Sequence, residues 1–276
     1  MAGILYLVPT PIGNLGDISE RIAQTLGSVD LIAAEDTRIT LKLLNHLGLK
    51  KPLVSYYRHN TDEAGQKVLD RLLAGENVAL CTDAGTPAIS DPGEDLVALC
   101  AQNGVEIVSI PGPCALVTAL AVSGLPTARF TFEGFLPMNK KNRRAQLESL
   151  RGEERTMIFY EAPHKLVSTL ADLRDSFGGE RRISLCRELT KLHEEVIRTT
   201  LAGAVERYRA DPPRGEFVLV VEGAPAPEEG EYTLTDGLER VARLREEGLS
   251  LKDAARQAAD EMGLSKKELY NTALKG

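Results

Sequence analysis

The sequence lacks the glycine and lysine patterns with which many enzymes bind nucleotides. No two of its 24 glycines are separated by a single residue, and no glycine is followed by a lysine. The first absence excludes the GxGxxG fingerprint of dinucleotide-binding enzymes and the usual glycine loop of Rossmann methyltransferases, and the second excludes a Walker A loop. Together, these two absences disfavour an ATPase, a GTPase or an NAD-dependent enzyme.

Cysteine, histidine and tryptophan are also scarce. The four cysteines, Cys81, Cys100, Cys114 and Cys186, form no CxxC pair and lie in apolar neighbourhoods, so we expect buried reduced thiols instead of a disulfide frame. The four histidines lack metal-ligand spacing, and we predict no structural metal. With no Trp and few Tyr and Phe, a platform for stacking single-stranded bases is not expected.

Long hydrophobic runs are absent as well. No apolar stretch approaches the roughly 18 residues needed to cross a bilayer, and MAGILYLVPT leads into a strand without a basic leader. We therefore expect a cytoplasmic protein with no membrane partner. The net charge of −7 argues against a non-specific nucleic-acid binder. Residues 129–198 nevertheless hold 14 basic and 11 acidic residues, which would suit either a polyanion-facing patch or an ordinary solvated face.

What the sequence does contain is three apolar runs that each end in a loop rich in Pro and Gly. ILYLV leads into residues 9–17, VALCT into 83–93 (DAGTPAISDPG) and VEIVSI into 111–115 (PGPCA). Gly accepts unusual backbone angles and Pro fixes its own, so such loops follow rigid paths. Any one of them could be an ordinary turn, but ligands of α/β proteins bind at the carboxyl ends of strands. Three such loops predict a pocket for a small adenosyl-type ligand, and S-adenosylmethionine suits loops with few charges.

The chain alternates strands and helices and then changes character. Strands expected at residues 4–8, 29–34, 53–56, 78–81 and 105–110, with helices between them, predict a mainly parallel sheet. After residue 123 the strands hold more aromatic and Thr residues, and we expect a mixed sheet. We predict α/β domains at 1–123 and 124–223 with a hinge near 122–127 and the ligand in the cleft between them.

Residues 224–234 (APAPEEGEYTL) are expected to form a linker. A helical extension follows over 235–276, with helix-start signals at Ser250 with Asp253 and at Ser265 with Glu268. It resembles a small helix-turn-helix. Such an appendage is more often a packing or dimer element than a nucleic-acid reader.

The loops and their flanking blocks resemble the tetrapyrrole methylase superfamily and, within it, the RsmI family of small-subunit ribosomal RNA methyltransferases. The matching blocks, in order, are LYLVPTPIGNLGDIS, AAEDTR, DAGTPAISDPG, IPGPCA, SGLP, FEGFLP, YEAPHK and RELTKLHEE. The resemblance implies a two-domain class III methyltransferase fold, a homodimer, and transfer of a methyl group from S-adenosylmethionine to the ribose 2′-hydroxyl of a cytidine in the decoding region of 16S ribosomal RNA. It further implies cofactor contacts from Pro11, Asp83, Ala84, Gly85, Thr86, Pro87, Ser90, Cys114, Ala115 and Tyr160. Cys114 stands where the family often has Ser.

Several acidic residues and one histidine could act as a general base, because a 2′-hydroxyl is a poor nucleophile until its proton begins to leave. The candidates are Asp36, Asp83, Glu161, His164 and Glu188, and we rank Glu161 and Asp36 first. Each acid could instead be a loop cap or an ion pair, for instance Asp36 with Arg38.

Contact with RNA is expected from the segment NKKNRRAQ. Its basic residues, Lys140, Lys141, Arg143 and Arg144, would bind phosphates with affinity that falls with salt, although an exposed helix start with solvated charges has the same pattern. Two other functions remain open. One is a porphyrinoid methyltransferase of the same fold, which would not need the basic segment; the other is a non-catalytic ligand sensor built on the same pocket.

Overall fold

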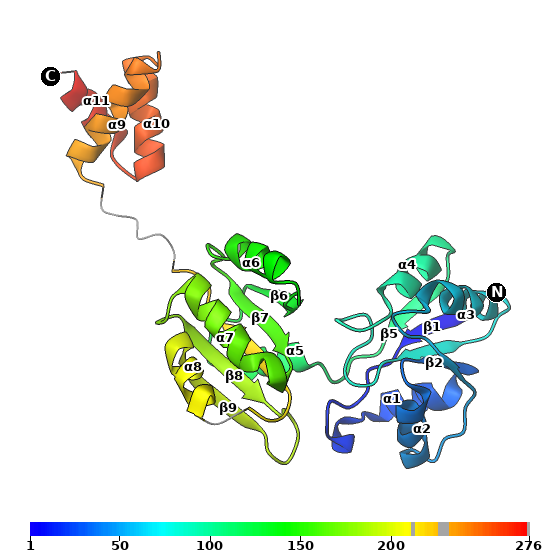
Figure 1. Cartoon of the computed structure of the whole chain (residues 1–276). Coiled ribbons are helices and arrows are strands. Elements are labelled where there is room, and N and C mark those ends of the chain that lie inside the picture. Colours follow the sequence, from blue (N-terminus) through cyan, green and yellow to red (C-terminus); the bar gives the residue numbers. More distant parts are fainter. Residues whose placement is uncertain (211–212, 226–231, 275–276) are drawn as a thin grey trace. The chain divides into compact units, whose positions relative to one another are not determined.

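The structure is a computed structural model that describes residues 1–210, 213–225 and 232–274 (Figure 1). It contains two compact units, Met1–Ala224 and Pro225–Gly276. Each unit is described by itself below, and the larger one holds both sheets.

The first sheet has five parallel strands in the order β3-β2-β4-β1-β5. They are β1 (Ile4–Leu7), β2 (Leu31–Ala34), β3 (Leu53–Ser55), β4 (Val78–Cys81) and β5 (Glu106–Ser109). All lie within the predicted ranges, so the parallel α/β prediction is confirmed. The neighbouring elements are the 3-10 turn η1 (Leu15–Asp17) and the helices α1 (Glu20–Ser28), α2 (Thr37–His46), α3 (Thr61–Leu73) and α4 (Glu94–Gln102).

Helices cover both faces of this sheet (Figure 1). Ala33 and Leu80 pack with residues of α3 and α4 on one face, whereas Ile32, Ala79 and Cys81 pack with residues of α1 and α2 on the other. Burial on both faces explains why β2 and β4 are continuous apolar runs without polar alternation.

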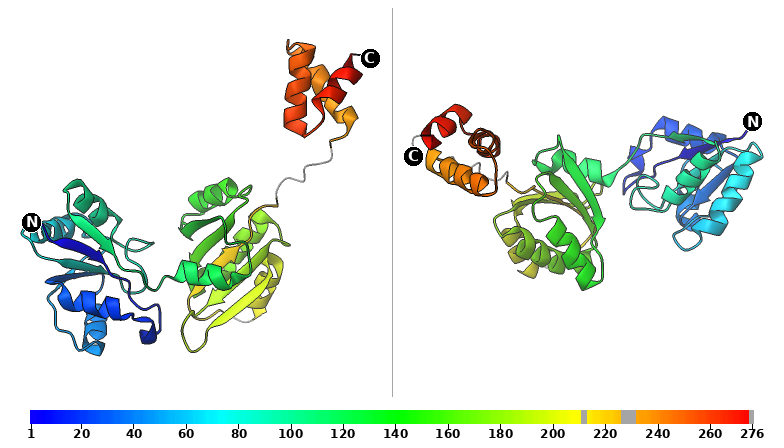
Figure 2. Two further views of the ribbon diagram at one scale, coloured as in Figure 1. Left: turned by 180° about the vertical axis from the view of Figure 1, so that it is seen from behind. Right: turned by 90° about the horizontal axis from the view of Figure 1, so that it is seen from above.

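The second sheet is mixed, with the order β6-β7-β10-β8-β9. Its strands are β6 (Phe130–Phe135), β7 (Thr156–Glu161), β8 (Arg182–Arg187), β9 (Glu195–Thr200) and β10 (Phe217–Val221). β6 runs parallel to β7, and the other pairs are antiparallel, which confirms the expected mixed sheet. One face is covered by α6 (Lys140–Ser149), α7 (Pro163–Phe177) and α8 (Leu201–Ala210), as other directions of view also show (Figure 2).

The opposite face of the second sheet is covered by α5 (Ala115–Ser123). Leu116, Ala119 and Leu120 of this helix pack against strand residues that include Ile158 and Val220. A domain boundary between residues 123 and 124 remains a prediction. Because α5 packs on the second sheet, its packing favours a boundary before this helix, in the loop that contains Pro111.

The smaller unit contains α9 (Leu234–Glu246), α10 (Leu251–Met262) and α11 (Lys266–Ala273) around a core rich in Leu and Ala. The expected caps form, since Ser250 and Ser265 accept hydrogen bonds from the amides of Asp253 and Glu268. Residues 226–231 of the predicted linker lie outside the described residues. Across the described ranges, no helix combines the length and hydropathy needed to cross a membrane.

Candidate active site

The structure brings the three Pro/Gly loops together at the carboxyl ends of β1, β4 and β5. Thr10 and Gly85 exchange two backbone hydrogen bonds, of 2.9 and 3.0 Å, which join the first loop to the second. The Thr86 hydroxyl donates to the Pro113 carbonyl at 2.9 Å and joins the second loop to the third. Because these strands are neighbours in the parallel order β4-β1-β5, their loops leave the sheet at the same edge.

A cavity of about 360 Å³ lies against these loops. We call its two sides the first wall, formed by Ile12 and residues of the loop 83–93, and the second wall, formed by residues of the second sheet, α7 and the loop after β8. Cys114 and Ala115, at the start of α5, also line it. Mostly apolar side chains with a few convergent polar groups are typical of a small-molecule site.

Most of the expected cofactor residues are found at this cavity. Seven of them line it, namely Ala84, Gly85, Thr86, Ser90, Cys114, Ala115 and Tyr160. Pro11 and Asp83 instead line a smaller cavity of about 290 Å³ beside α2, and Pro87 lines neither of the two. The Tyr160 ring is held in place because its hydroxyl accepts a hydrogen bond of 3.1 Å from the Leu116 amide. Burial raises the pKa of Tyr160, so this phenol stays neutral.

Backbone strain is concentrated at the two walls. In the described part of the chain, the non-glycine residues with positive φ are Ala88 and Ser90 in the first wall's loop and Glu188 and Thr190 in the loop after β8. Such conformations are uncommon outside glycine and persist where surrounding contacts fix them, often at functional sites. The strain points to the same cavity as the sequence motifs do.

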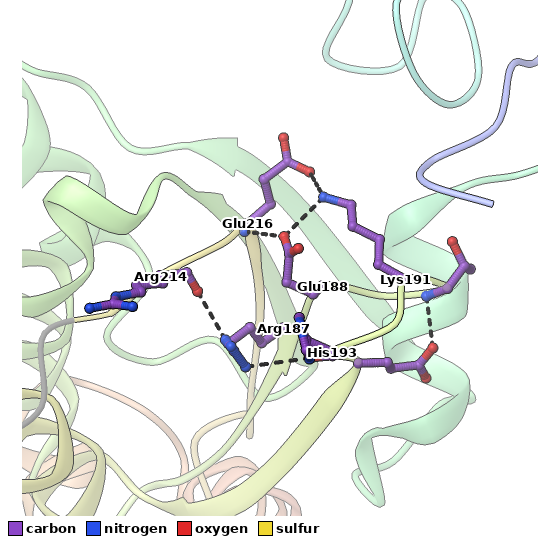
Figure 3. Close-up of polar contacts among 8 residues, drawn as sticks. Arg187, Glu188, Lys191, His193, Arg214 and Glu216 are labelled. Atoms are coloured by element: carbon purple, nitrogen blue, oxygen red, sulfur yellow. Dashed lines mark hydrogen bonds and ion pairs between the residues drawn. The ribbon is translucent and has the colours of Figure 1, made fainter.

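The second wall carries a network of paired charges (Figure 3). Lys191 donates to Glu188 at 2.9 Å and to Glu216 at 2.8 Å, and the Glu216 amide donates to Glu188 at 2.9 Å. The amide and Lys191 lower the pKa of Glu188. The stem of Lys191 packs on Gly13, where an added Cβ would lie 2.4 Å from the Lys191 Cγ. This network therefore joins the second wall to the first of the three loops.

Neither of the two first-ranked catalytic candidates is a free carboxylate. Glu161 lines the cavity, but it is 4% exposed and accepts hydrogen bonds from the Thr169 hydroxyl and from the Ala162 amide. Asp36 lines neither cavity; it caps α2 and pairs with Arg38, and these contacts lower its pKa to about 2. A carboxylate with so low a pKa is a weak base near neutral pH. The alternative role expected for Asp36, an ion pair with Arg38, is the one that the structure has.

Three acidic residues that the sequence analysis did not predict as a group lie at the first wall: Asp91 is in this wall, and Asp83 and Glu35 lie beside it. The Asp83 amide donates to Glu35 at 3.2 Å, and Asp83 accepts from the Asp36 amide at 3.0 Å. Burial raises the pKa of both Glu35 and Asp83; the charge of Asp83 adds to the rise at Glu35, and the charge of Asp36 adds to the rise at Asp83. Asp91 lines the larger cavity, and burial with the charges of Glu35 and Asp83 raises its pKa to about 7. In the sequence, the only feature that marks Asp91 is the segment SDPG, which ends the loop.

The cysteines are free thiols, as expected, but one is not buried. Burial raises the pKa of Cys81 to about 12 and that of Cys100 and Cys186 to about 11. Cys114 is only half-buried because it faces the larger cavity. Among the residues that the structure describes, no group of three or more His, Cys, Asp or Glu is placed to bind a metal ion.

Three of the four basic residues expected to bind RNA are exposed, and the fourth, Arg143, is buried. Lys140, Lys141 and Arg144 are exposed at the start of α6, which Asn139 caps. Arg143 is 8% exposed because its guanidinium points into the protein, where it donates to Asp172 at 2.5 Å and to Thr169 at 2.8 Å. It therefore tethers α6 to α7 and is not available to RNA.

Comparison with known families agrees with this geometry. Residues 4–205 match the family of tetrapyrrole (corrin/porphyrin) methylases, and residues 233–276 match the RsmI C-terminal HTH domain. The crystal structure of uroporphyrin-III C-methyltransferase from Thermus thermophilus with S-adenosylhomocysteine is similar with a TM-score of 0.56 and 16% identity, over 79% of this chain and 97% of that chain. At this identity the likeness shows the fold alone. The fold and site thus define a class III, tetrapyrrole methylase-like protein.

Two relatives with known names identify the family within this class. Ribosomal RNA small subunit methyltransferase I of Synechocystis sp. is 48% identical over 272 residues, which cover 99% of this chain and 98% of the relative. The protein of the same name from Pseudomonas aeruginosa is 48% identical over 275 residues, with 99% and 97% covered. The chain belongs to the ribosomal RNA small subunit methyltransferase I family, RsmI.

Proposed function

We propose that this protein transfers a methyl group from S-adenosylmethionine to the ribose 2′-hydroxyl of a cytidine in the decoding region of 16S ribosomal RNA. The observation that carries the proposal is the 48% identity, over 99% of the chain, with proteins named as small-subunit ribosomal RNA methyltransferases. The match of residues 233–276 to the RsmI C-terminal domain supports it further. A porphyrinoid methyltransferase, in contrast, has only the fold in its favour.

The cavity fits a molecule with an apolar adenosyl part and few charges. Its first wall offers backbone groups at Ala84, Gly85 and Thr86, and the second wall offers apolar surface from Phe135 and Tyr160. Together with Ser90, Cys114 and Ala115, these residues would hold the cofactor, while Pro11, Asp83 and Pro87 would shape the loops behind them. S-adenosylmethionine, when bound, supplies an electrophilic methyl group on a sulfonium.

The residues of the chain then have two tasks. The fixed loops and the hydrogen-bonded Tyr160 hold the reacting groups in line, and alignment of this kind supplies a large part of the acceleration of a displacement. Lys140, Lys141 and Arg144 would bind RNA phosphates, which gives affinity but little choice of sequence. Recognition would then depend on the shape of the small ribosomal subunit. We also propose that the protein acts as a cytoplasmic homodimer.

Mass mapping of ribosomal RNA methyl groups tests the proposal. We expect 16S RNA from cells without the gene to lack one ribose methyl group on a cytidine, and the purified protein to restore it on subunits from those cells. Unchanged RNA in both assays would contradict the proposal. Methylation of a porphyrinoid would favour the second candidate, and calorimetric binding of the cofactor without any transfer would favour a sensor.

A further inference from the structure

Four carboxylate side chains line the larger cavity, and three of them already have partners. Glu161 accepts from Thr169 and Ala162, while Glu188 and Glu216 share Lys191. Asp91, the fourth, makes no hydrogen bond or ion pair with any residue in the described ranges. A general base must accept a proton readily, and of these four carboxylates Asp91 is the one with no donor at either oxygen among the described residues, whereas Lys191 stabilises the charges of Glu188 and Glu216.

The backbone around Asp91 fixes where this carboxylate lies. Ser90 before it has φ +69°, and Gly93 shortly after it has φ +144° and packs so closely on Leu80 that an added Cβ would lie 2.8 Å from the Leu80 Cδ2. Pro92 stands between and fixes its own φ. A residue held on such a rigid path can present a side chain in one place, as catalysis requires.

Charges from several elements surround Asp91. Glu35 after β2 and Asp83 after β4 disfavour its ionised form, whereas Arg58 after β3 favours it. Across the cavity, the neutral phenol of Tyr160 on β7 is close enough for Asp91 to influence its pKa. With burial as the largest cause, the pKa of Asp91 lies at about 7, which is near the optimum for a base that works at neutral pH.

We propose that Asp91 is the catalytic base that removes the proton from the ribose 2′-hydroxyl, an inference that rests on the function proposed above. The bond between the 2′-oxygen and the methyl carbon forms while the bond between that carbon and sulfur breaks, and the electron pair of the broken bond stays on sulfur. The hydroxyl proton passes to the Asp91 carboxylate and then to solvent. The products are the methylated ribose and S-adenosylhomocysteine, so atoms and charge balance.

Asp91→Asn tests this role because it keeps the size of the side chain and removes its basicity. We expect kcat on small subunits to fall about 10²- to 10⁴-fold, the usual contribution of a general base. The Kd of S-adenosylhomocysteine, measured by calorimetry, should change less than about twofold. In the wild-type protein kcat should rise with pH to a plateau above about 7, and the variant should lose this dependence.

The protein without cofactor gives a second readout. The folded-state pKa of Asp91 is raised from 3.8 to about 7, so the folded protein binds more protons than the unfolded chain between these values. Ionised Asp91 therefore lowers stability, fully above pH 7 and not at all below the unfolded pKa. Asp91→Asn should raise the Tm at pH 8 and leave it unchanged near pH 3.5. This shift also shows that the variant is folded.

Asp95→Asn is the matched control, since Asp95 is exposed in the first turn of α4 and does not line the cavity. It should keep wild-type kcat. The inference is overturned if Asp91→Asn retains kcat and its pH dependence, or if it weakens S-adenosylhomocysteine binding by the same factor as it lowers kcat/KM, because Asp91 would then be a cofactor ligand. An inactive wild-type protein would overturn the proposed function together with this inference, whereas an active one with an equally active variant overturns this inference alone.

Discussion

The two walls of the cavity hold their shape by different means. The first wall relies on backbone: Gly85 and Gly93 have positive φ, and Ala88 and Ser90 are held in the same region. The second wall relies on side-chain charge, with Lys191 between two carboxylates. A backbone-built wall leaves its acidic residue, Asp91, free for chemistry, whereas a charge-built wall uses its acidic residues for structure. The following predictions test this difference, from the largest expected effect on stability to the smallest.

Gly93→Ala should be the most damaging change to the first wall. The new Cβ would lie 2.8 Å from the Leu80 Cδ2 and 3.1 Å from the Ala88 nitrogen, at φ +144°. We expect the free energy of unfolding, measured with urea, to fall by about 3 kcal/mol or more. Gly104→Ala is the control: it has φ +68° but open space around it, and should lose about 1 kcal/mol. Equal losses would show that the contact with Leu80 does not constrain the loop.

Lys191→Met should weaken the second wall by about 1–3 kcal/mol at pH 7, because two carboxylates lose their donor. The pKa of Glu188 is lowered in the folded protein, so its contribution is present above the ordinary value of 4.5 and is lost as pH falls. The difference between wild type and variant should therefore shrink toward pH 3. Lys67→Met, which removes an exposed pair with Glu63, should lose less than about 0.5 kcal/mol. An equal loss in both variants would contradict a special role for the network.

Ala88→Gly should relieve strain in the first wall, since Ala88 has φ +66°. We expect a gain of about 1 kcal/mol in the free energy of unfolding and, because the loop becomes looser, weaker binding of S-adenosylhomocysteine by calorimetry. Ala84→Gly in the same loop, where φ is not positive, should lose stability instead, by up to about 1 kcal/mol. A loss in both variants would show that Ala88 is not strained.

Changing Lys140, Lys141 and Arg144 together to Glu should hardly alter stability, by about 0.5 kcal/mol or less, because these residues are exposed. Binding to small subunits should weaken, and the slope of log Kd against log salt should become shallower by about 2, given roughly 0.7 for each lost contact with a single strand. The Kd of S-adenosylhomocysteine should not change. Lys67→Glu on α3 is the control, and an equal effect there would assign the loss to overall charge.

Local signals in the sequence were enough to predict the fold and the loops. The strands of the first sheet fall within their predicted ranges because continuous apolar runs between Gly- and Pro-rich breaks are a strong signal. Seven of the ten expected cofactor residues line the cavity. Six of these lie in or directly after loops that follow strands of the parallel sheet, and such loops can lie only at one edge; the seventh, Tyr160, is on β7 of the second sheet. The placement of α5 was harder, because its residues are apolar all round and do not indicate which sheet they cover.

The state of individual side chains could not be predicted in this way. Arg143 has the same sequence context as Arg144, but the turn of α6 directs one inward to Asp172 and the other to solvent. Glu161 was a reasonable catalytic candidate until the structure placed the Thr169 hydroxyl against it. The pKa of Asp91 is raised first by burial and then by the charges of Glu35 and Asp83, and Glu35 lies far away in the sequence. Partners that are distant along the chain decide such questions, and no local pattern encodes them.

A crystal structure with S-adenosylhomocysteine tests the central claim most directly, namely that both walls enclose one methyl-donor site. We predict that one molecule of S-adenosylhomocysteine will contact Thr86 and Ser90 on the first wall and Tyr160 on the second, with its sulfur facing the side of the cavity where Asp91 lies. A molecule bound instead in the smaller cavity beside Pro11 and Asp83, or one that touches a single wall, would contradict the account.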